Sequence, residues 1–89
     1  MAGTLTDRDA VERYLAQVLA DVLGMSSAQV HPRRPLKRQG LDSLMAVEVR
    51  TRVQRDLGMM LPIAKMLGGH SVAELAGEVF SQLGDPGRH

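Results

Sequence analysis

Apolar residues at helical spacing predict a helix near the N-terminus. They recur at the i, i+3, i+4 and i+7 positions that form one stripe of an α-helix: Val11, Tyr14, Leu15, Val18, Leu19 and Val22. Thr6 is placed to cap this helix, with acidic Asp9 three residues later, and Gly24 can end it in a left-handed conformation. We therefore expect a helix over about Asp7 to Leu23.

The next segment, Met25 to Leu41, has no helical period and contains two prolines, which restrict the preceding residues and lack an amide donor. Long connections without secondary structure are unusual in a compact domain. Either apolar residues anchor this one to the core or part of it forms a short turn. The candidate anchors are Val30, Leu36 and Leu41.

A second helix is predicted to follow Asp42 as N-cap and to run to Leu57, before Gly58. Its apolar residues fall into two groups on nearly opposite sides. The core stripe consists of Ala46, Val49, Val53 and Leu57. The other side carries Leu44, Val47, Glu48, Thr51 and Arg55. Because a small domain rarely buries two opposed sides of one helix, we expect Leu44 and Val47 to be partly exposed unless another segment covers them.

Two further helices are predicted. Met59 to Gly69 has enough apolar residues for a short helix that ends at the Gly68-Gly69 pair. Ser71 and Glu74 form a capping box before a final amphipathic helix. That helix repeats the spacing of the first one, with Val72, Leu75, Ala76, Val79, Phe80 and Leu83.

The sum is an all-α bundle of three main helices and one short helix, with a long loop between the first two. The first two helices can run roughly antiparallel or parallel. We expect one domain over residues 7–83, with flexible termini at 1–6 and 84–89.

Composition narrows the class of protein. At 89 residues, 44% hydrophobic and 24% charged, the chain is a single small globular domain. It has no cysteine, which excludes disulfides, thiolate metal sites and cysteine nucleophiles, and we expect no metal site. A net charge of +1 and few aromatic residues argue against nucleic acid as a partner. No apolar run approaches a membrane span or a signal peptide, so we expect no membrane partner and a cytoplasmic location.

The long loop carries a basic cluster, Arg33, Arg34, Lys37 and Arg38. A solvated loop is the simpler interpretation and the one that we favour. An acidic or phosphate-bearing partner is the alternative.

The stretch "QGLDSLMAVE", residues 39–48, raises the question whether Ser43 is a nucleophile. Activation of a serine requires a base within reach and donors for the oxyanion. His31 and His70 lie in loop or turn contexts, His89 is terminal, and no G-x-S-x-G elbow is present. "LDSL" is similar to the Gly-Asp-Ser-Leu box of lipolytic esterases, but it lacks the glycine and would need a larger α/β domain. We therefore predict no catalytic residue.

Ser43 at the start of a helix suggests a different use. The amides and dipole of a helix N-terminus favour an anionic phosphate, so a phosphodiester on the Ser43 oxygen is compatible with this position. By itself, a plain role as N-cap or first helical residue would be the favoured explanation of a serine in such a position.

The residues around Ser43 resemble the attachment box of acyl carrier proteins, specifically the carrier domains of type I polyketide synthases. Gly40-Leu41-Asp42-Ser43-Leu44 matches that box, and "LMAVEVRTRV" continues it. Val30-His31-Pro32 resembles the first-loop element of the family, and Leu61-Pro62 and "SVAELA" resemble the starts of its last two helices. The likeness extends from about Val11 to Leu83.

This resemblance implies that Ser43 accepts 4′-phosphopantetheine from coenzyme A through a Mg²⁺-dependent phosphopantetheinyl transferase. The arm would carry acyl thioesters to a ketosynthase, an acyltransferase and other synthase domains. Asp42 would cap the helix and support the transferase reaction. Partner recognition would fall to Leu44, Val47, Glu48 and Thr51. The isolated domain would be monomeric and non-catalytic, and part of a larger synthase.

Some residues depart from the family pattern. Gln39 stands where an apolar residue commonly precedes the glycine, and Leu36 replaces a frequent aromatic. The second helix also lacks the acidic face of freestanding fatty-acid carriers, since it carries Arg50, Arg52 and Arg55 against Glu48 and Asp56. Its partners are expected to differ accordingly.

Three alternatives remain. "LGGHSVA", residues 67–73, resembles the attachment box of peptidyl carriers in nonribosomal peptide synthetases, but only 18 residues follow Ser71 whereas 46 follow Ser43. The capping box with Glu74 accounts for Ser71, and the aspartate before Ser43 favours acyl over aminoacyl cargo. The alternatives to an acyl carrier are thus a peptidyl carrier domain of a nonribosomal peptide synthetase, an armless helical adaptor and a small hydrolase.

Overall fold

The computed structural model describes residues 7–83, and over this range the chain is helical without strands. Its four α-helices are α1 (Arg8–Leu23), α2 (Ser43–Leu57), α3 (Ile63–Leu67) and α4 (Val72–Leu83). Two 3₁₀ turns, η2 (Ser27–Gln29) and η3 (Leu36–Gln39), lie in the connection between α1 and α2. The predicted all-α class and the order of elements are confirmed. The predicted flexible segments 1–6 and 84–89, and the Leu83 side chain, lie outside the described residues.

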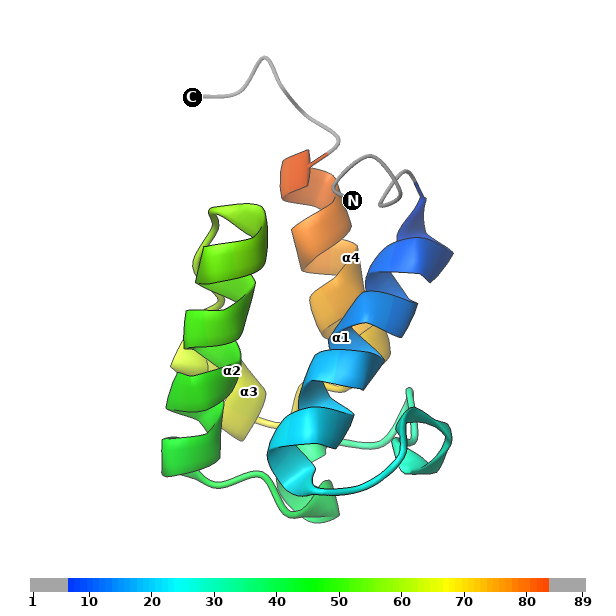
Figure 1. Ribbon diagram of the computed structural model, residues 1–89, viewed down its shortest axis with the longest axis vertical. Coiled ribbons are helices and arrows are strands. Elements are labelled where there is room, and N and C mark those ends of the chain that lie inside the picture. The colour runs from blue at the N-terminus through cyan, green and yellow to red at the C-terminus, as the bar shows by residue number, and fades with distance from the viewer. Residues whose placement is uncertain (1–6, 84–89) are drawn as a thin grey trace.

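The helices form a bundle in which α1 packs against both α4 and α2, while α3 packs against α2 (Figure 1). The chain descends through α1 and rises through α2 and α4 in this view, so α1 and α2 are antiparallel. The connection between them therefore stays at the lower end of the bundle, where α2 begins.

The first helix differs from the prediction at its start. Its N-cap is Asp7, whose carboxylate accepts a 2.7 Å hydrogen bond from the amide of Ala10, and the helix begins at Arg8. The prediction that Thr6 caps this helix is therefore wrong. Either residue offers a side-chain oxygen, and the structure pairs that of Asp7 with an amide of the first turn. The other end is as predicted, because Gly24 closes α1 with a φ of 75°.

One apolar core joins all the helices. The inward stripe of α1 is buried along with Ala46, Val49 and Val53 of α2, Met66 of α3 and the apolar face of α4. Leu57, predicted as a core residue of the same α2 stripe, is only half-buried where the helix ends.

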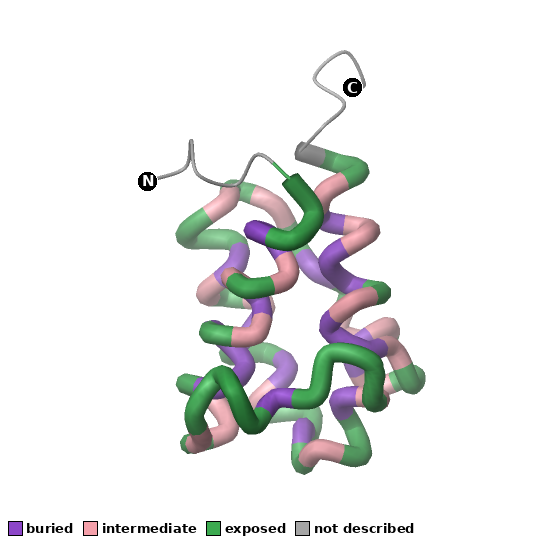
Figure 2. The backbone as a smooth tube through the Cα atoms, turned by 90° about the vertical axis from the view of Figure 1, so that its right-hand side faces the viewer, coloured by how far each residue is buried: buried purple, intermediate pink, exposed green. Residues whose placement is uncertain are grey.

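The long connection between α1 and α2 is held both by apolar anchors in the core and by short turns. Val30, Leu36 and Leu41 are buried in the core, and the two 3₁₀ turns shorten the irregular stretches between them. Figure 2 shows this connection on its near side at the lower end, mostly exposed and interrupted by a buried position. The connection is thus a fixed surface layer, attached at three points to the bundle.

Candidate functional site

Ser43 is the first residue of α2 and is exposed. The N-cap before it is Asp42, whose Oδ1 accepts a 2.9 Å hydrogen bond from the amide of Met45. The Asp42 carboxylate is thus occupied with the first turn of the helix. This arrangement, which the sequence predicted, leaves the hydroxyl-bearing residue at the outer surface of a helix N-terminus.

The backbone on both sides of Ser43 is anchored. Leu41 is 4% exposed, and its amide donates to the carbonyl oxygen of Leu36, which is itself fully buried. Gly40 lies between these anchors with a φ of 106°, a conformation that glycine adopts without strain. On the other side, Ala46 is fully buried. Ser43 is therefore presented on a rigid support rather than on a free loop.

Beside Ser43, α2 displays the exposed side that the sequence predicted. Leu44 is 80% exposed and Val47 is 39% exposed, and no other segment of residues 7–83 covers them. Glu48 and Thr51 are also exposed. The Thr51 hydroxyl donates to the Val47 carbonyl at 2.9 Å, so its polar atom is turned to the helix backbone. The result is an apolar surface next to Ser43 with one carboxylate on it.

Met60, in the connection between α2 and α3, is a third large exposed hydrophobic residue, with 56% of its surface accessible. Sequence reasoning missed it. The only signal was the short run Met59-Met60-Leu61, in which the half-buried Met59 and the buried Leu61 flank it.

The arginines of α2 are partly committed to intramolecular contacts. Arg52 reaches Asp21 of α1 at 3.1 Å, and Arg55 lies 3.5 Å from Asp56. The hydrogen bond from Arg52, followed by one from Gln17, lowers the pKa of Asp21 below its ordinary value. Arg52 thus serves the contact between α1 and α2 and does not face the Ser43 surface.

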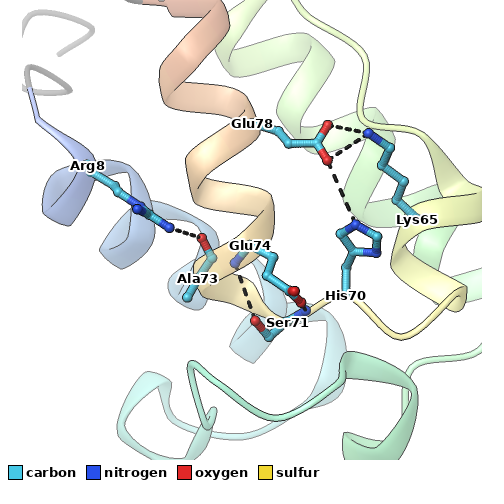
Figure 3. Close-up of polar contacts among 7 residues, drawn as sticks. All are labelled: Arg8, Lys65, His70, Ser71, Ala73, Glu74 and Glu78. Atoms are coloured by element: carbon cyan, nitrogen blue, oxygen red, sulfur yellow. Dashed lines mark hydrogen bonds and ion pairs between the residues drawn. The ribbon is translucent and has the colours of Figure 1, made fainter.

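The described histidines do not form a catalytic pair with Ser43. His31 accepts a 3.2 Å hydrogen bond at Nδ1 from the amide of Arg33, in its own loop. His70 has its Nε2 at 3.9 Å from Glu78, which also binds Lys65 Nζ at 2.7 Å (Figure 3). Both histidines have structural neighbours away from α2. His89 lies outside the described residues.

Ser71 is structural. It is 4% exposed, its hydroxyl accepts from the amide of Glu74 at 3.3 Å, and its own amide donates to Glu74 Oε1 at 2.9 Å (Figure 3). This is the predicted capping box. Because the Ser71 oxygen is buried and engaged, an enzyme could not modify it without opening the start of α4.

Metal-binding and membrane-spanning features are both lacking in the part of the chain that the structure describes. Among residues 7–83, no group of three or more histidine or acidic side chains is arranged to hold a metal ion. No helix in that range has the length and apolar character needed to cross a membrane.

Comparison with known proteins identifies the family to which the chain belongs. The family model described as "Phosphopantetheine attachment site" matches residues 13–79, a range that includes both Ser43 and Ser71. The structure is similar to that of BlmI, a type-II acyl-carrier-protein from Streptomyces verticillus involved in bleomycin biosynthesis. The TM-score is 0.76 and the sequence identity is 30%, over 92% of this chain and 96% of that one.

The sequence relatives are much larger proteins. This chain is 37% identical over 76 residues to the PKS-NRPS hybrid synthetase psoA of Aspergillus fumigatus, a match that covers 85% of the chain and 2% of that protein. It is 37% identical over 83 residues to the lovastatin nonaketide synthase mokA of Monascus pilosus, a match that covers 88% of the chain and 3% of that protein. The chain thus spans only a few per cent of the length of these relatives.

The four-helix fold and the family match define a carrier protein. The chain belongs to the phosphopantetheine attachment family. Its class is therefore a non-catalytic carrier whose cofactor is covalent 4′-phosphopantetheine, as the attachment box had implied. The hydrolase alternative is not supported.

Proposed function

We propose that residues 7–83 form an acyl carrier domain that holds polyketide or fatty acyl intermediates as thioesters on a 4′-phosphopantetheine arm attached to Ser43. The observation that carries this proposal is the contrast between the two candidate serines. Ser43 is exposed at the first turn of α2, whereas Ser71 is buried in a capping box. Relatives that are polyketide synthases, or hybrids of these with nonribosomal peptide synthetases, support the polyketide part.

The residues around Ser43 fit the arm. The first amides of α2 and the dipole of this helix favour the negative charge of a phosphodiester on the serine oxygen. Asp42 fixes the first turn through Met45, and Leu41 and Ala46 hold the backbone on either side. When bound, the arm supplies a terminal thiol for acyl thioesters. The chain contributes a stable, exposed point of attachment.

The proposed partners are a phosphopantetheinyl transferase, a ketosynthase, an acyltransferase and other synthase domains. The exposed side of α2, with Leu44, Val47, Glu48 and Thr51, is the proposed recognition surface. Because a carrier visits several enzymes in turn, each contact should be small and rapidly broken. In this proposal the domain is monomeric and works in the cytoplasm.

The first test is priming. The purified chain is incubated with coenzyme A, Mg²⁺ and a broad-specificity transferase, and the intact mass is measured for the native chain and for Ser43→Ala and Ser71→Ala. We expect one phosphopantetheinyl group on the native chain and on Ser71→Ala, and none on Ser43→Ala. A native chain that is folded but gains no mass would remove the Ser43 assignment.

The second test concerns cargo. Several relatives are hybrids of polyketide and nonribosomal peptide synthetases, so peptidyl carriage is the nearest alternative. The primed chain is offered to an acyltransferase with its acyl donor and to an adenylation domain with amino acid and ATP. Loading by the acyltransferase alone supports acyl carriage, and loading by the adenylation domain alone would make the chain a peptidyl carrier.

An armless adaptor makes a different prediction for the same variant. If the exposed α2 side served binding alone, Ser43→Ala would retain binding to the partner. A carrier loses cargo delivery completely with this substitution, because the group to which cargo is attached is absent.

A further inference from the structure

Gln39 ends the turn that leads to the attachment box. It is the last residue of η3, and residues 40–42 separate it from Ser43. Its side-chain oxygen accepts a 2.8 Å hydrogen bond from the amide of His31. Its side-chain nitrogen donates to the carbonyl oxygens of His31 and Arg34, both at 2.9 Å. One side chain therefore ties the end of η3 to the segment that precedes this turn.

The three bonds of Gln39 require an amide side chain. A carboxylate of the same length can accept from the His31 amide but has no N–H group to donate. An apolar side chain can neither donate nor accept. Because Gln39 stands where an apolar residue is common in the family, this tie is a feature of the present chain and not of the attachment box in general.

The other hydrogen bonds at the end of η3 are local. The amide of Gly40 donates to the carbonyl oxygen of Lys37 at 3.4 Å, and the amide of Arg38 donates to that of Pro35 at 3.0 Å. Bonds in short 3₁₀ turns have poorer geometry than those in α-helices. Gly40, with a φ of 106°, has no side chain to pack against the bundle. The Gln39 side chain is therefore the tie that holds the last residue of η3 to a neighbouring segment.

The end of η3 is connected to Ser43 by a short path. The amide of Leu41 donates to the carbonyl oxygen of Leu36, the first residue of η3, at 3.2 Å. Leu41 is buried, and Asp42 after it caps α2. Both η3 and the start of α2 lie at the lower end of the bundle (Figure 1). Loosening of η3 thus also loosens the residues through which the chain enters α2.

We propose that Gln39 is a positioning residue for the priming of Ser43. By holding η3, it keeps residues 40–43 in the conformation that the phosphopantetheinyl transferase binds. This inference rests on the proposed function. It assigns to Gln39 an effect on the reaction of a side chain that it does not touch.

Gln39 takes no part in the bond changes of priming. The Ser43 oxygen forms a bond to the phosphorus of coenzyme A that bears the pantetheine. The bond from this phosphorus to 3′,5′-ADP breaks, 3′,5′-ADP leaves, and the serine proton passes to a base of the transferase. Gln39 sets the fraction of chains in which Ser43 is ready for this step. The apparent affinity of the transferase for the carrier falls in proportion to that fraction.

The test measures initial rates of priming against carrier concentration, with coenzyme A, Mg²⁺ and the transferase held constant. Gln39→Leu removes all three bonds, and Gln39→Glu keeps the size of the side chain but removes both donated bonds. We expect Gln39→Leu to raise KM for the carrier about 3- to 10-fold and to leave kcat within about 2-fold. Gln39→Glu should also raise KM, because it retains at most the bond from His31.

The matched control is Gln29→Leu, the same substitution in the same connection. The Gln29 side chain accepts a 3.0 Å hydrogen bond from the amide of Ser26 within η2, away from the attachment box. This variant should leave KM within about 1.5-fold of the native value, since it shares no partner with Gln39. Circular dichroism confirms that every variant is folded.

NMR gives a readout that does not depend on the transferase. In Gln39→Leu, the backbone amide signals of residues 40–43 should shift or broaden, whereas those in the middle of α1 should not. Gln29→Leu should leave the signals of residues 40–43 unchanged. This pattern would place the effect of Gln39 at the attachment box and not in the bundle as a whole.

Priming of the native chain is measured first, and its absence would refute the proposed function itself. Given priming, three results would overturn the role of Gln39. One is a native KM for both folded Gln39 variants. Another is an equal rise in KM for Gln29→Leu, which would indicate general loosening of the connection. The third is a fall in kcat with an unchanged KM, because a positioning residue of this kind acts before the transferase binds.

Discussion

The Tyr14 hydroxyl of α1 donates a 2.7 Å hydrogen bond to Asp56 Oδ2 near the end of α2. This contact joins residues 42 positions apart in the sequence and connects the two antiparallel helices at the end opposite to Ser43. Together with the Arg52–Asp21 ion pair, it fixes how α2 lies on α1. The orientation of the exposed α2 side therefore depends on polar contacts as well as on the core.

Tyr14→Phe should weaken this connection while retaining the apolar ring. Because one side-chain hydrogen bond is lost and Asp56 can turn to water, we expect a fall of about 0.5 to 1 kcal/mol in the free energy of unfolding. Urea unfolding followed by circular dichroism measures it. A variant as stable as the native chain would show that the contact contributes nothing to stability.

The environment of Tyr14 also predicts that the folded chain loses stability at alkaline pH. Burial, together with the hydrogen bond to Asp56, raises the pKa of Tyr14 well above its ordinary value of 10.0. Because the pKa is higher in the folded than in the unfolded state, the neutral phenol contributes fully to the free energy of unfolding below pH 10. This contribution is lost as the pH rises from 10 through the pKa of the folded state. Tyr14 is the only tyrosine, so an absorbance titration of tyrosinate reports it directly. Titration at the ordinary value in the folded chain would contradict the prediction.

The two sides of α2 should respond differently to a charge. Val49 and Val53 are fully buried, so Val49→Asp or Val53→Asp should lower the free energy of unfolding by more than about 3 kcal/mol, because an unpaired carboxylate enters the core. Val47 is partly exposed, so Val47→Asp should cost less than about 1 kcal/mol and weaken a partner reaction instead. Thermal unfolding of all three variants checks this prediction. If Val47→Asp were destabilised as strongly as Val49→Asp and Val53→Asp, Val47 would belong to the core.

Substitution of Ser71 should affect the stability of the chain, whereas substitution of Ser43 should affect its priming. Ser71→Ala removes the side-chain half of a capping box and should lower the free energy of unfolding by about 1 kcal/mol without affecting priming. Ser43→Ala should leave stability nearly unchanged, since the cap of α2 belongs to Asp42, and should abolish priming. Urea unfolding measures the stability of both variants, and intact mass measures their priming. If Ser71→Ala abolished priming and Ser43→Ala did not, the assignment of Ser43 would be refuted.

Gln39→Leu restores the apolar character common in the family and removes three hydrogen bonds from the first loop. The amide of His31 would lose its acceptor, so we expect its hydrogen exchange to accelerate strongly while amides within α1 and α2 keep their protection. Exchange followed by NMR resolves these positions. Unchanged protection at His31 would show that Gln39 does not hold the loop.

Local signals in the sequence were sufficient for most of the fold and for the position of Ser43. Asp42, Gly58 and the Ser71–Glu74 box mark helix ends through bonds within four residues, so they can be recognised without tertiary structure. Thr6 and Asp7 are adjacent residues that can both cap, and the choice between them depends on the backbone angle at which the chain enters α1.

Contacts between distant segments could not be predicted. The Tyr14–Asp56 and Lys65–Glu78 bonds depend on the angle and depth at which helices pack, and the sequence pattern does not specify these. Gln39 was recognised only as a departure from the family pattern. Its three bonds require that the loop fold back on itself, which follows from the burial of Val30 and Leu36 on either side.

Mapping the arm to a peptide tests the central claim most directly. After priming, cleavage at arginine and lysine should release residues 39–50, which contain Ser43 and no other serine, while Ser71 falls in the separate peptide 66–88. Tandem mass spectrometry of the digest should locate the phosphopantetheinyl group on peptide 39–50 at Ser43. An unmodified 39–50 peptide, with the group on 66–88, would contradict the assignment of Ser43 as the carrier serine.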